Sequence, residues 1–264
     1  MKRISLIAVL LCISSVSLIS RQIPIATGWI LSDSSGKISV PAKIPGSVHT
    51  DLIAAGVIPD PFAGVNNLNL GWVDEKVWIY STEFDIPDEP AQSKKEGNPA
   101  LWLVFEGLDT KADVYLNDRL IISADNMFRT WRADVNSLVK KGSNSLKVIF
   151  YPAVKYVKER GANYRFNLPG GEWAHIRKAA YHFGWDWGPR FVTCGIWKPV
   201  YLEREERFSA RNTWIRTLSI APESAGMEFG MDFYTAQKGE YKFEIRESAT
   251  GRLLTSFKNE LRAG

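Results

Sequence analysis

Apolar residues that alternate with polar ones constrain the fold of this chain more than any other feature of its sequence. The segment KADVYL (111–116) alternates in this way, and Asn117–Asp118 follows it as a hairpin-turn signal. Further strands are predicted at 77–86, 100–108, 145–150 and 198–203. Many short strands separated by turn signals predict an all-β sandwich or jelly roll, which we place at residues 25–205.

Two short helices and one long loop interrupt the predicted strands. In SVHTDLIAAG, Ser47 is suited to the N-cap of a helix and Gly56 to the position just after its end. A second helix is predicted at 154–160. The Pro-, Lys- and Glu-rich segment 87–99 is typical of a solvated hairpin loop.

The residues after 205 predict a second β unit that is incomplete. EREERF (203–208) is typical of a linker, and alternation resumes in MEFGMDFY (227–234) and YKFEI (241–245), followed by a tight turn at Thr250–Gly251. An immunoglobulin-like sandwich needs about seven strands and roughly 100 residues, whereas 206–264 offers fewer than about 60. We therefore expect 206–264 to be an incomplete immunoglobulin-like β-sandwich, cut by a truncation inside the domain.

The N-terminus predicts export. Lys2 and Arg3 precede an apolar run and a Ser-rich stretch, the pattern of a secretory signal peptide, which we assign to residues 1–20. The mature protein is then expected in a periplasm or outside the cell, and free of the membrane, because no other apolar run is long enough to span a bilayer. Cys194 lies in the apolar segment FVTCGIW and is expected to be packed and unreactive.

Charge balance and short motifs argue against several classes of function. The 33 Lys and Arg residues against 29 Asp and Glu give a net charge of +4 without a basic stripe, so nucleic acid is a poor candidate partner. His49, His175 and His182 lack metal-ligand spacing, and no calcium-loop or nucleotide fingerprint is present. We therefore expect neither a metal nor a cofactor.

The segment YHFGWDWGPR (181–190) carries a candidate sugar site. Asp186 stands between Trp185 and Trp187, with glycines on either side. An indole can stack on the apolar C–H face of a sugar, and a carboxylate can accept hydrogen bonds from its hydroxyl groups. The alternative is that both indoles are buried in packing and that Asp186 caps a turn. On the residues alone, both interpretations stand.

Ordered motifs along nearly the whole mature chain carry a resemblance. GLDTKADVYLND (107–118) and GIWKPVYLE (195–203) are similar to glycoside hydrolase family 2 as a whole, which includes β-galactosidases and β-glucuronidases. PGSVH (45–49), PDPF (59–62) and GWDWGPR (184–190) are similar to its β-mannosidase branch. The chain therefore resembles the N-terminal part of a β-mannosidase of this family.

The resemblance implies a parent with three core parts. These are a galactose-binding-like jelly roll, an immunoglobulin-like sandwich and a (β/α)₈ barrel that supplies both catalytic glutamates. In the family, the Asp that matches Asp186 reaches into the barrel's pocket and binds hydroxyl groups of the terminal mannose. We therefore predict Asp186, Trp185 and Trp187 as substrate-binding residues, a mannoside or mannose-containing oligosaccharide as the ligand, and the barrel of the full-length parent as the partner.

Some neighbouring residues depart from this pattern or are weaker candidates. Relatives usually carry Asn and then an acid after PDPF, whereas here Asn66 is followed by Asn67, so a charge-dependent role at that position is in doubt. Arg190 could orient Asp186 or be solvated at the surface, and solvation is favoured. Trp173 and His175 could line the same cleft, although packing is favoured for each.

No catalytic residue is predicted in this chain. Retaining glycoside hydrolysis needs two carboxyl groups about 5–5.5 Å apart, and nothing in the sequence holds the one candidate pair, Asp186 and Glu172, at that separation. We expect the sugar-recognition and scaffold portion of an exo-acting hydrolase that removes terminal non-reducing β-D-mannose with retention, inactive without its barrel. A free-standing carbohydrate-binding module is the alternative, and an interaction domain without a sugar role is a remote third.

Overall fold

The computed structural model describes residues 21–86, 101–166, 168–204, 208–235, 238–247 and 249–262. The chain divides into two compact units. Gln22–Gln92 and Leu101–Glu203 form the first unit, and the strands after Arg204 belong to the second. The predicted signal peptide and the predicted loop at 87–99 lie outside the described residues.

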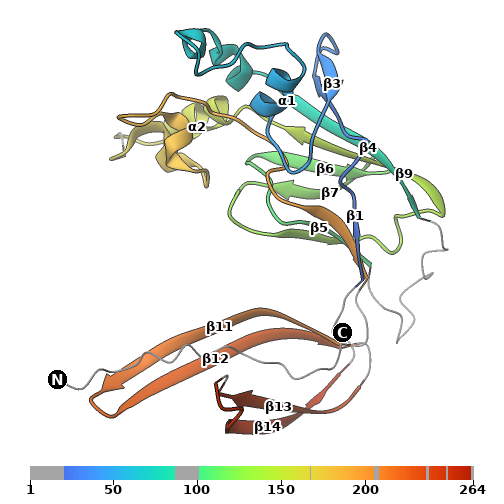
Figure 1. Ribbon diagram of the computed structural model, residues 1–264, viewed down its shortest axis with the longest axis vertical. Coiled ribbons are helices and arrows are strands. Elements are labelled where there is room, and N and C mark those ends of the chain that lie inside the picture. The colour runs from blue at the N-terminus through green and yellow to red at the C-terminus, as the bar shows by residue number, and fades with distance from the viewer. Residues whose placement is uncertain are drawn as a thin grey trace. The chain divides into compact units, whose positions relative to one another are not determined.

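Two sheets make up most of the first unit (Figure 1). One has the strand order β3-β2-β4-β9-β6-β7 and the other β1-β10-β5-β8. The paired strands β2–β4, β4–β9, β6–β9, β6–β7 and β5–β8 run antiparallel. The strands are β1 (Arg21–Pro24), β2 (Ile30–Asp33), β3 (Ser39–Pro41), β4 (Trp78–Ile86), β5 (Leu101–Phe105), β6 (Ala112–Leu116), β7 (Arg119–Ala124), β8 (Trp131–Asp134), β9 (Gly142–Phe150) and β10 (Val200–Arg204).

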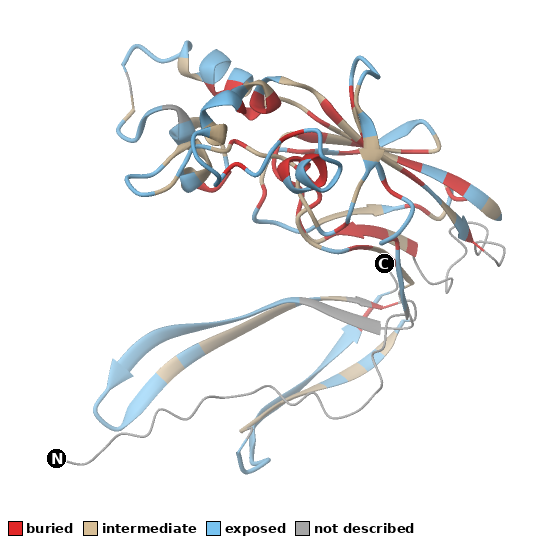
Figure 2. Ribbon diagram, turned by 45° about the horizontal axis from the view of Figure 1, so that its top comes forward, coloured by how far each residue is buried: buried red, intermediate tan, exposed pale blue. Residues whose placement is uncertain are grey.

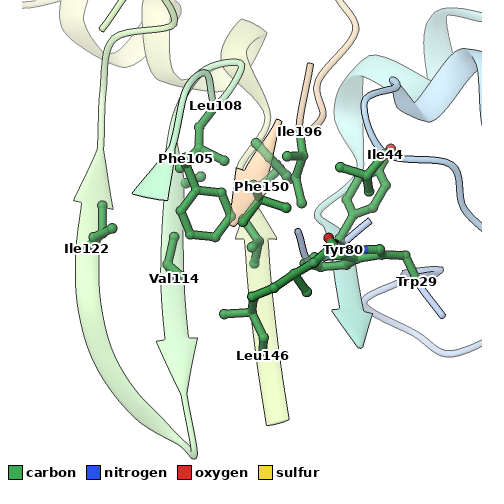
Figure 3. Close-up of a cluster of buried hydrophobic side chains, with 14 of the residues drawn as sticks. Trp29, Ile44, Tyr80, Phe105, Leu108, Val114, Ile122, Leu146, Phe150 and Ile196 are labelled. Atoms are coloured by element: carbon green, nitrogen blue, oxygen red, sulfur yellow. Dashed lines mark hydrogen bonds between the residues drawn. The ribbon is translucent and has the colours of Figure 1, made fainter. Parts of the chain in front are cut away.

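The apolar residues of both sheets meet in one core (Figure 3). Tyr80, Val114 and Leu146 come from the six-stranded sheet, Phe105 and Leu202 come from the four-stranded sheet, and all are buried. Along β6 and β9, buried residues alternate with more exposed ones, as the sequence predicts. Burying one large apolar side chain contributes about 1.5–3 kcal/mol, so this alternation is the main stabilising feature of the unit.

The predicted hairpin turn after β6 is confirmed. Asn117 and Asp118 have φ values of 48° and 62°, the two consecutive positive values that a type I′ turn requires. Asn and Asp tolerate this region better than other residues with a side chain. The turn therefore follows directly from the local sequence.

Both predicted helices are present at one end of the first unit (Figure 1). Helix α1 (Val48–Ala54) begins with Ser47 as N-cap, in a capping box with Thr50, and Gly56 follows its end with φ 69°. Helix α2 spans Ala153–Gly161. Short 3-10 helices complete this end: η1 (Asn66–Asn69), η2 (Gly71–Glu75), η3 (Gly171–His175) and η4 (Ala180–Phe183). None of the helices in the described ranges is long and apolar enough to cross a membrane.

A buried carboxylate connects α1 to the core. Asp51 accepts hydrogen bonds from the Tyr80 hydroxyl at 2.9 Å and from the Lys43 amide at 3.0 Å. Burial raises the pKa of Asp51 above its ordinary value, and these two donors oppose that shift. The hydroxyl of the core tyrosine is therefore satisfied, and the helix is fixed against β4.

The second unit consists of two antiparallel hairpins. They are formed by β11 (Phe208–Ala221) with β12 (Ser224–Thr235), and by β13 (Gly239–Arg246) with β14 (Leu253–Leu261). The predicted turn at Thr250–Gly251 is confirmed, because Gly251 has φ 71° and its amide donates to the Glu247 carbonyl at 2.8 Å.

Aromatic rings join the two hairpins, but most of the unit is open to solvent. Phe243 of β13 lies 5.1 Å from Phe233 of β12 and 5.1 Å from Phe257 of β14, measured between ring centroids. Figure 2 shows these strands mainly in the exposed and intermediate colours. Ile215 and Met227 are each 42% exposed. The described part of this unit therefore lacks a buried core comparable with that of the first.

Gly195 occupies a position that no other residue fits. Its amide and carbonyl pair with Asp109 at 3.1 and 3.0 Å, and its φ is 154°. An added Cβ would lie 2.7 Å from the Gly46 carbonyl oxygen and 2.8 Å from the Ser47 Cα. The segment around Gly195 is thus tightly inserted between Asp109 and the start of α1.

We expect Gly195→Ala to lower the free energy of unfolding by about 2–4 kcal/mol, from backbone strain and the clash with Gly46. The control is Gly71→Ala, where the added methyl group meets open space. The urea midpoint, followed by tryptophan fluorescence, measures both variants. Equal midpoints would contradict the assigned geometry.

Candidate functional site

The candidate sugar-binding residues lie on one tight turn. Trp185 and Gly188 exchange two backbone hydrogen bonds, with N–O distances of 3.3 and 3.2 Å, so Asp186 and Trp187 form the tip. The rings of Trp185 and Trp187 are 5.9 Å apart and nearly perpendicular, at 78°. Gly184, with φ 104°, permits the sharp entry into this turn.

All three candidate side chains are open to solvent. Trp187 is 84% exposed and Trp185 is 52% exposed. Asp186 is also exposed, and across the described ranges its carboxylate takes part in no hydrogen bond or ion pair. This arrangement differs from the alternative in which both indoles are packed inside and Asp186 caps a turn. Substrate binding by the three residues stays a prediction.

Arg190 holds the exit of this turn. Its Nη1 donates to Asp74 Oδ2 at 2.5 Å and not to Asp186, and its side chain is 40% exposed. Asp74, on η2, has a side chain only 3% exposed. Burial raises the pKa of Asp74, and the Arg190 charge opposes that shift.

Lys178 holds the entry of the same segment. Its side chain is fully buried, and its Nζ donates to Asp109 Oδ1 at 2.5 Å and to the Thr193 carbonyl at 2.7 Å. The Thr110 hydroxyl donates to the same carboxylate oxygen. A buried ammonium is stable only with such compensation, and here a carboxylate and a carbonyl provide it.

Two histidines lie against this buried pair. Burial, followed by the charge of Lys178, lowers the pKa of His182 to about 4, although Asp109, 3.5 Å away, opposes the shift. Burial, followed by the charges of His182 and Lys178, lowers the pKa of His49 to about 4. Neither ring nitrogen of His49 has a hydrogen-bond partner in the described structure. Both rings are therefore neutral at physiological pH.

The buried environment also accounts for Cys194. Its thiol is free, and burial raises its pKa well above the ordinary value. A thiol that stays protonated is a poor nucleophile. This agrees with the expectation that Cys194 is packed and unreactive.

The weaker candidates lie on neighbouring elements. Trp173 and His175 belong to η3, which contacts α2 and η4. Trp173 is 39% exposed, and the His175 ring lies 5.0 Å from the ring of Tyr164. The side chain of Glu172 lies outside the described residues, so its separation from Asp186 stays untested.

The described residues contain no group of three or more His, Cys, Asp or Glu side chains that could hold a metal ion. A hollow of about 430 Å³ lies elsewhere, on the outward face of the six-stranded sheet. Its lining includes Ser81, Glu83, Tyr115 and Lys147, and none of the residues of the turn.

Comparison with known proteins places this arrangement in a family. Residues 29–198, more than half of the chain, match the family model described as "Glycosyl hydrolase 2 galactose-binding domain-like". The chain belongs to this family. The match covers the whole six-stranded sheet, β5 and β8 of the four-stranded sheet, and the exposed turn at Asp186.

The relatives of this glycosyl hydrolase 2 domain include β-mannosidases. The chain is 42% identical over 169 residues to "Beta-mannosidase B" of Thermothelomyces thermophilus, covering 61% of this chain and 19% of the relative. It is 38% identical over 253 residues to "Beta-mannosidase B" of Aspergillus fumigatus, covering 89% and 28%. The crystal structure of the β-D-mannosidase from Dictyoglomus thermophilum aligns with a TM-score of 0.73 and 31% identity, covering 91% and 29%.

These matches confirm the resemblance to the N-terminal part of β-mannosidases. They also fix its extent, because the chain spans between about a fifth and under a third of the length of each of these three proteins.

The sequence analysis missed the residues that anchor the turn in this glycosyl hydrolase 2 domain. Lys178, Asp109 and Asp74 were not singled out, and the ion pair of Arg190 with Asp74 was not predicted. The available signal was positional: a lysine and an arginine flank the segment AAYHFGWDWGP on its two sides. Their partners could not be found, since both lie far away in the sequence.

The two neutral histidines predict a stability that falls in mild acid. Each has a folded pKa of about 4 against about 6.5 when unfolded, so the unfolded state binds more protons below pH 6.5 and stability is lost down to about pH 4. We expect a loss on the order of 2–4 kcal/mol between pH 7 and pH 5 for the pair.

Urea unfolding at pH 7, 6 and 5 checks this expectation, and His49→Leu should remove roughly half of the loss. The raised pKa values of Asp51 and Asp74 act in the opposite direction and are common to both proteins. An undiminished loss in the variant would show that His49 is not one of the groups responsible.

Proposed function

We propose that this chain is the sugar-recognition and scaffold portion of an exo-acting β-mannosidase-like glycoside hydrolase. In this proposal Asp186 binds hydroxyl groups of a terminal β-D-mannose, and Trp185 and Trp187 form an apolar wall beside it. One observation carries the proposal: a carboxylate between two exposed indoles has no internal partner, in a domain of the glycosyl hydrolase 2 family.

The chemistry of the turn supports a sugar ligand. A hydrogen bond to a charged acceptor contributes about 1.5–3 kcal/mol, and Asp186 has both carboxylate oxygens available. Indole rings offer large, rigid contact surfaces, and Trp187 is 84% exposed. Because Asp186 faces no cation in the described structure, it can take two neutral hydroxyl donors without breaking an existing ion pair.

Apolar side chains near the turn support a domain partner. Phe62 is 77% exposed, and its ring contacts Phe191 at 5.9 Å, which follows the turn in the chain. Val65 and Leu68 are 66% and 74% exposed. A cluster of exposed large apolar residues is typical of a surface that another domain covers. We propose that the catalytic (β/α)₈ barrel of a full-length parent is this partner and that it supplies both catalytic carboxyl groups.

The remaining parts of the chain complete the proposal. Residues 25–205 form the galactose-binding-like jelly roll, and 206–264 are part of an immunoglobulin-like sandwich whose second sheet would cover side chains such as Ile215 and Phe257, now 42% and 53% exposed. Residues 1–20 are a signal peptide, and the mature protein works in a periplasm or outside the cell.

A chimera tests the role of Asp186. This chain would replace the matching segment of the Dictyoglomus thermophilum β-D-mannosidase, and a chromogenic β-mannoside would report activity. We expect Asp186→Ala to lower kcat/KM by about tenfold to a thousandfold, because about 1.4 kcal/mol corresponds to each factor of ten.

The matched control is Asp85→Ala, which removes an exposed carboxylate of β4 on another part of the domain. It should leave kcat/KM unchanged. Equal values for the Asp186 variant and the parent chimera would remove Asp186 from the sugar site.

The alternative, a free-standing carbohydrate-binding module, makes a different prediction for the chain by itself. A portion that only completes another domain's pocket should show no millimolar binding of mannose or β-mannosyl oligosaccharides in isothermal titration. A saturable isotherm that Asp186→Ala abolishes would favour the module and count against the scaffold proposal.

A further inference from the structure

The segment that carries the turn has little regular structure of its own to hold it. Between Lys178 and Arg190 it contains only η4 (Ala180–Phe183) and the paired residues Trp185 and Gly188. Its tip is exposed. The position of the Asp186 carboxylate must therefore be set by contacts at the two ends of the segment.

Each end is fixed by an ion pair to a different part of the domain. At the entry, Lys178 bonds Asp109, which follows β5. At the exit, Arg190 bonds Asp74 of η2. We propose that these two pairs, the paired anchors, are the positioning residues of the Asp186 turn. Its use in sugar recognition rests on the proposed function above.

Lys178 also connects the chain before the turn with the chain after it. The same ammonium that bonds Asp109 donates to the carbonyl of Thr193, 15 residues further along the chain and beyond the turn. The chain entering the turn and the chain after it are thereby held to one buried atom. Because the side chain is fully buried, its ammonium has no solvent partner to replace these two bonds.

The exit is held in place from a second direction. Residues just after Thr193 are bonded on both sides: Gly195 pairs with Asp109, and the Cys194 carbonyl accepts from the Val48 amide at 2.9 Å. Asp109 is therefore shared by the entry, through Lys178, and by the exit, through Gly195. The Gly195 contact uses the Asp109 backbone, so loss of the Asp109 carboxylate frees the Lys178 end and leaves this second contact in place.

Apolar packing at the segment is modest by comparison. Val192 forms a small cluster with Ala153 and Val154 of α2, and Phe183 packs against its edge. This cluster is separate from the main core. Phe191, directly after Arg190, packs against the main core, and the two ion pairs add directional contacts at the ends of the segment.

Amide hydrogen exchange, measured by NMR on this chain without sugar, tests the paired anchors. The variant Lys178→Met/Asp109→Asn removes both charges together, so that no buried charge is left unpaired. We expect the amides of Trp185 and Gly188 to exchange at least about tenfold faster, because the turn then opens locally. The core amides of β4 and β9 should stay protected.

The matched control is Lys76→Met/Asp33→Asn, which removes another ion pair of the first unit, at 2.8 Å between Nζ and Oδ2. It should leave exchange at Trp185 and Gly188 unchanged. Turn amides that exchange at the original rate in the Lys178 double variant, with the core intact, would overturn the proposal.

If that variant does not fold, Arg190→Gln/Asp74→Asn tests the other, partly exposed ion pair. We again expect faster amide exchange at Trp185 and Gly188, and unchanged exchange would overturn the proposal.

The chimera separates this inference from the proposed function. Loss of turn protection without any effect of Asp186→Ala on kcat/KM would leave the anchors standing and remove the sugar role. If Asp186→Ala lowers kcat/KM but the anchor variants leave amide exchange at the turn unchanged, the sugar role stands and the anchor proposal fails.

Discussion

The buried ion pair between Lys178 and Asp109 is the interaction on which, in our proposal, the position of the Asp186 turn depends. Removing an ammonium and a carboxylate from water is costly, and breaking such a pair by deleting one partner typically costs 3–5 kcal/mol. Here the cost of burial is offset by further bonds to the Thr110 hydroxyl and the Thr193 carbonyl. Such a pair adds little to net stability when its attraction only balances the cost of dehydrating both charges.

Burial sets the chemistry of the neighbouring groups. It keeps His49 and His182 neutral, with a smaller contribution from the Lys178 charge, and it raises the pKa of the Cys194 thiol. None of these groups is exposed to a ligand at the tip of the turn. The buried polar groups thus lie at the two ends of the segment, whereas Trp185, Asp186 and Trp187 at its tip are exposed.

Local sequence patterns were enough to predict most of the first unit. The alternation of apolar and polar residues located β4, β6 and β9. Ser47 predicted a helix start and Asn117–Asp118 a hairpin turn, because capping and turn preferences act over two or three residues. The partners of Lys178 and Arg190 escaped prediction for the opposite reason. They lie 69 and 116 residues away, and no local pattern specifies which carboxylate a cation will meet.

The separation of these partners has a consequence for how the protein is made. A contact between residues 116 positions apart forms only after most of the intervening chain has been synthesised and collapsed, because closing so long a loop carries an entropy cost that earlier contacts must offset. The hairpin of β6 and β7, by contrast, closes over two residues. During synthesis, the turn at Asp186 is therefore among the late features of the first unit to reach its final form, and a chain stalled before Arg190 would also lack β10, the strand between β1 and β5.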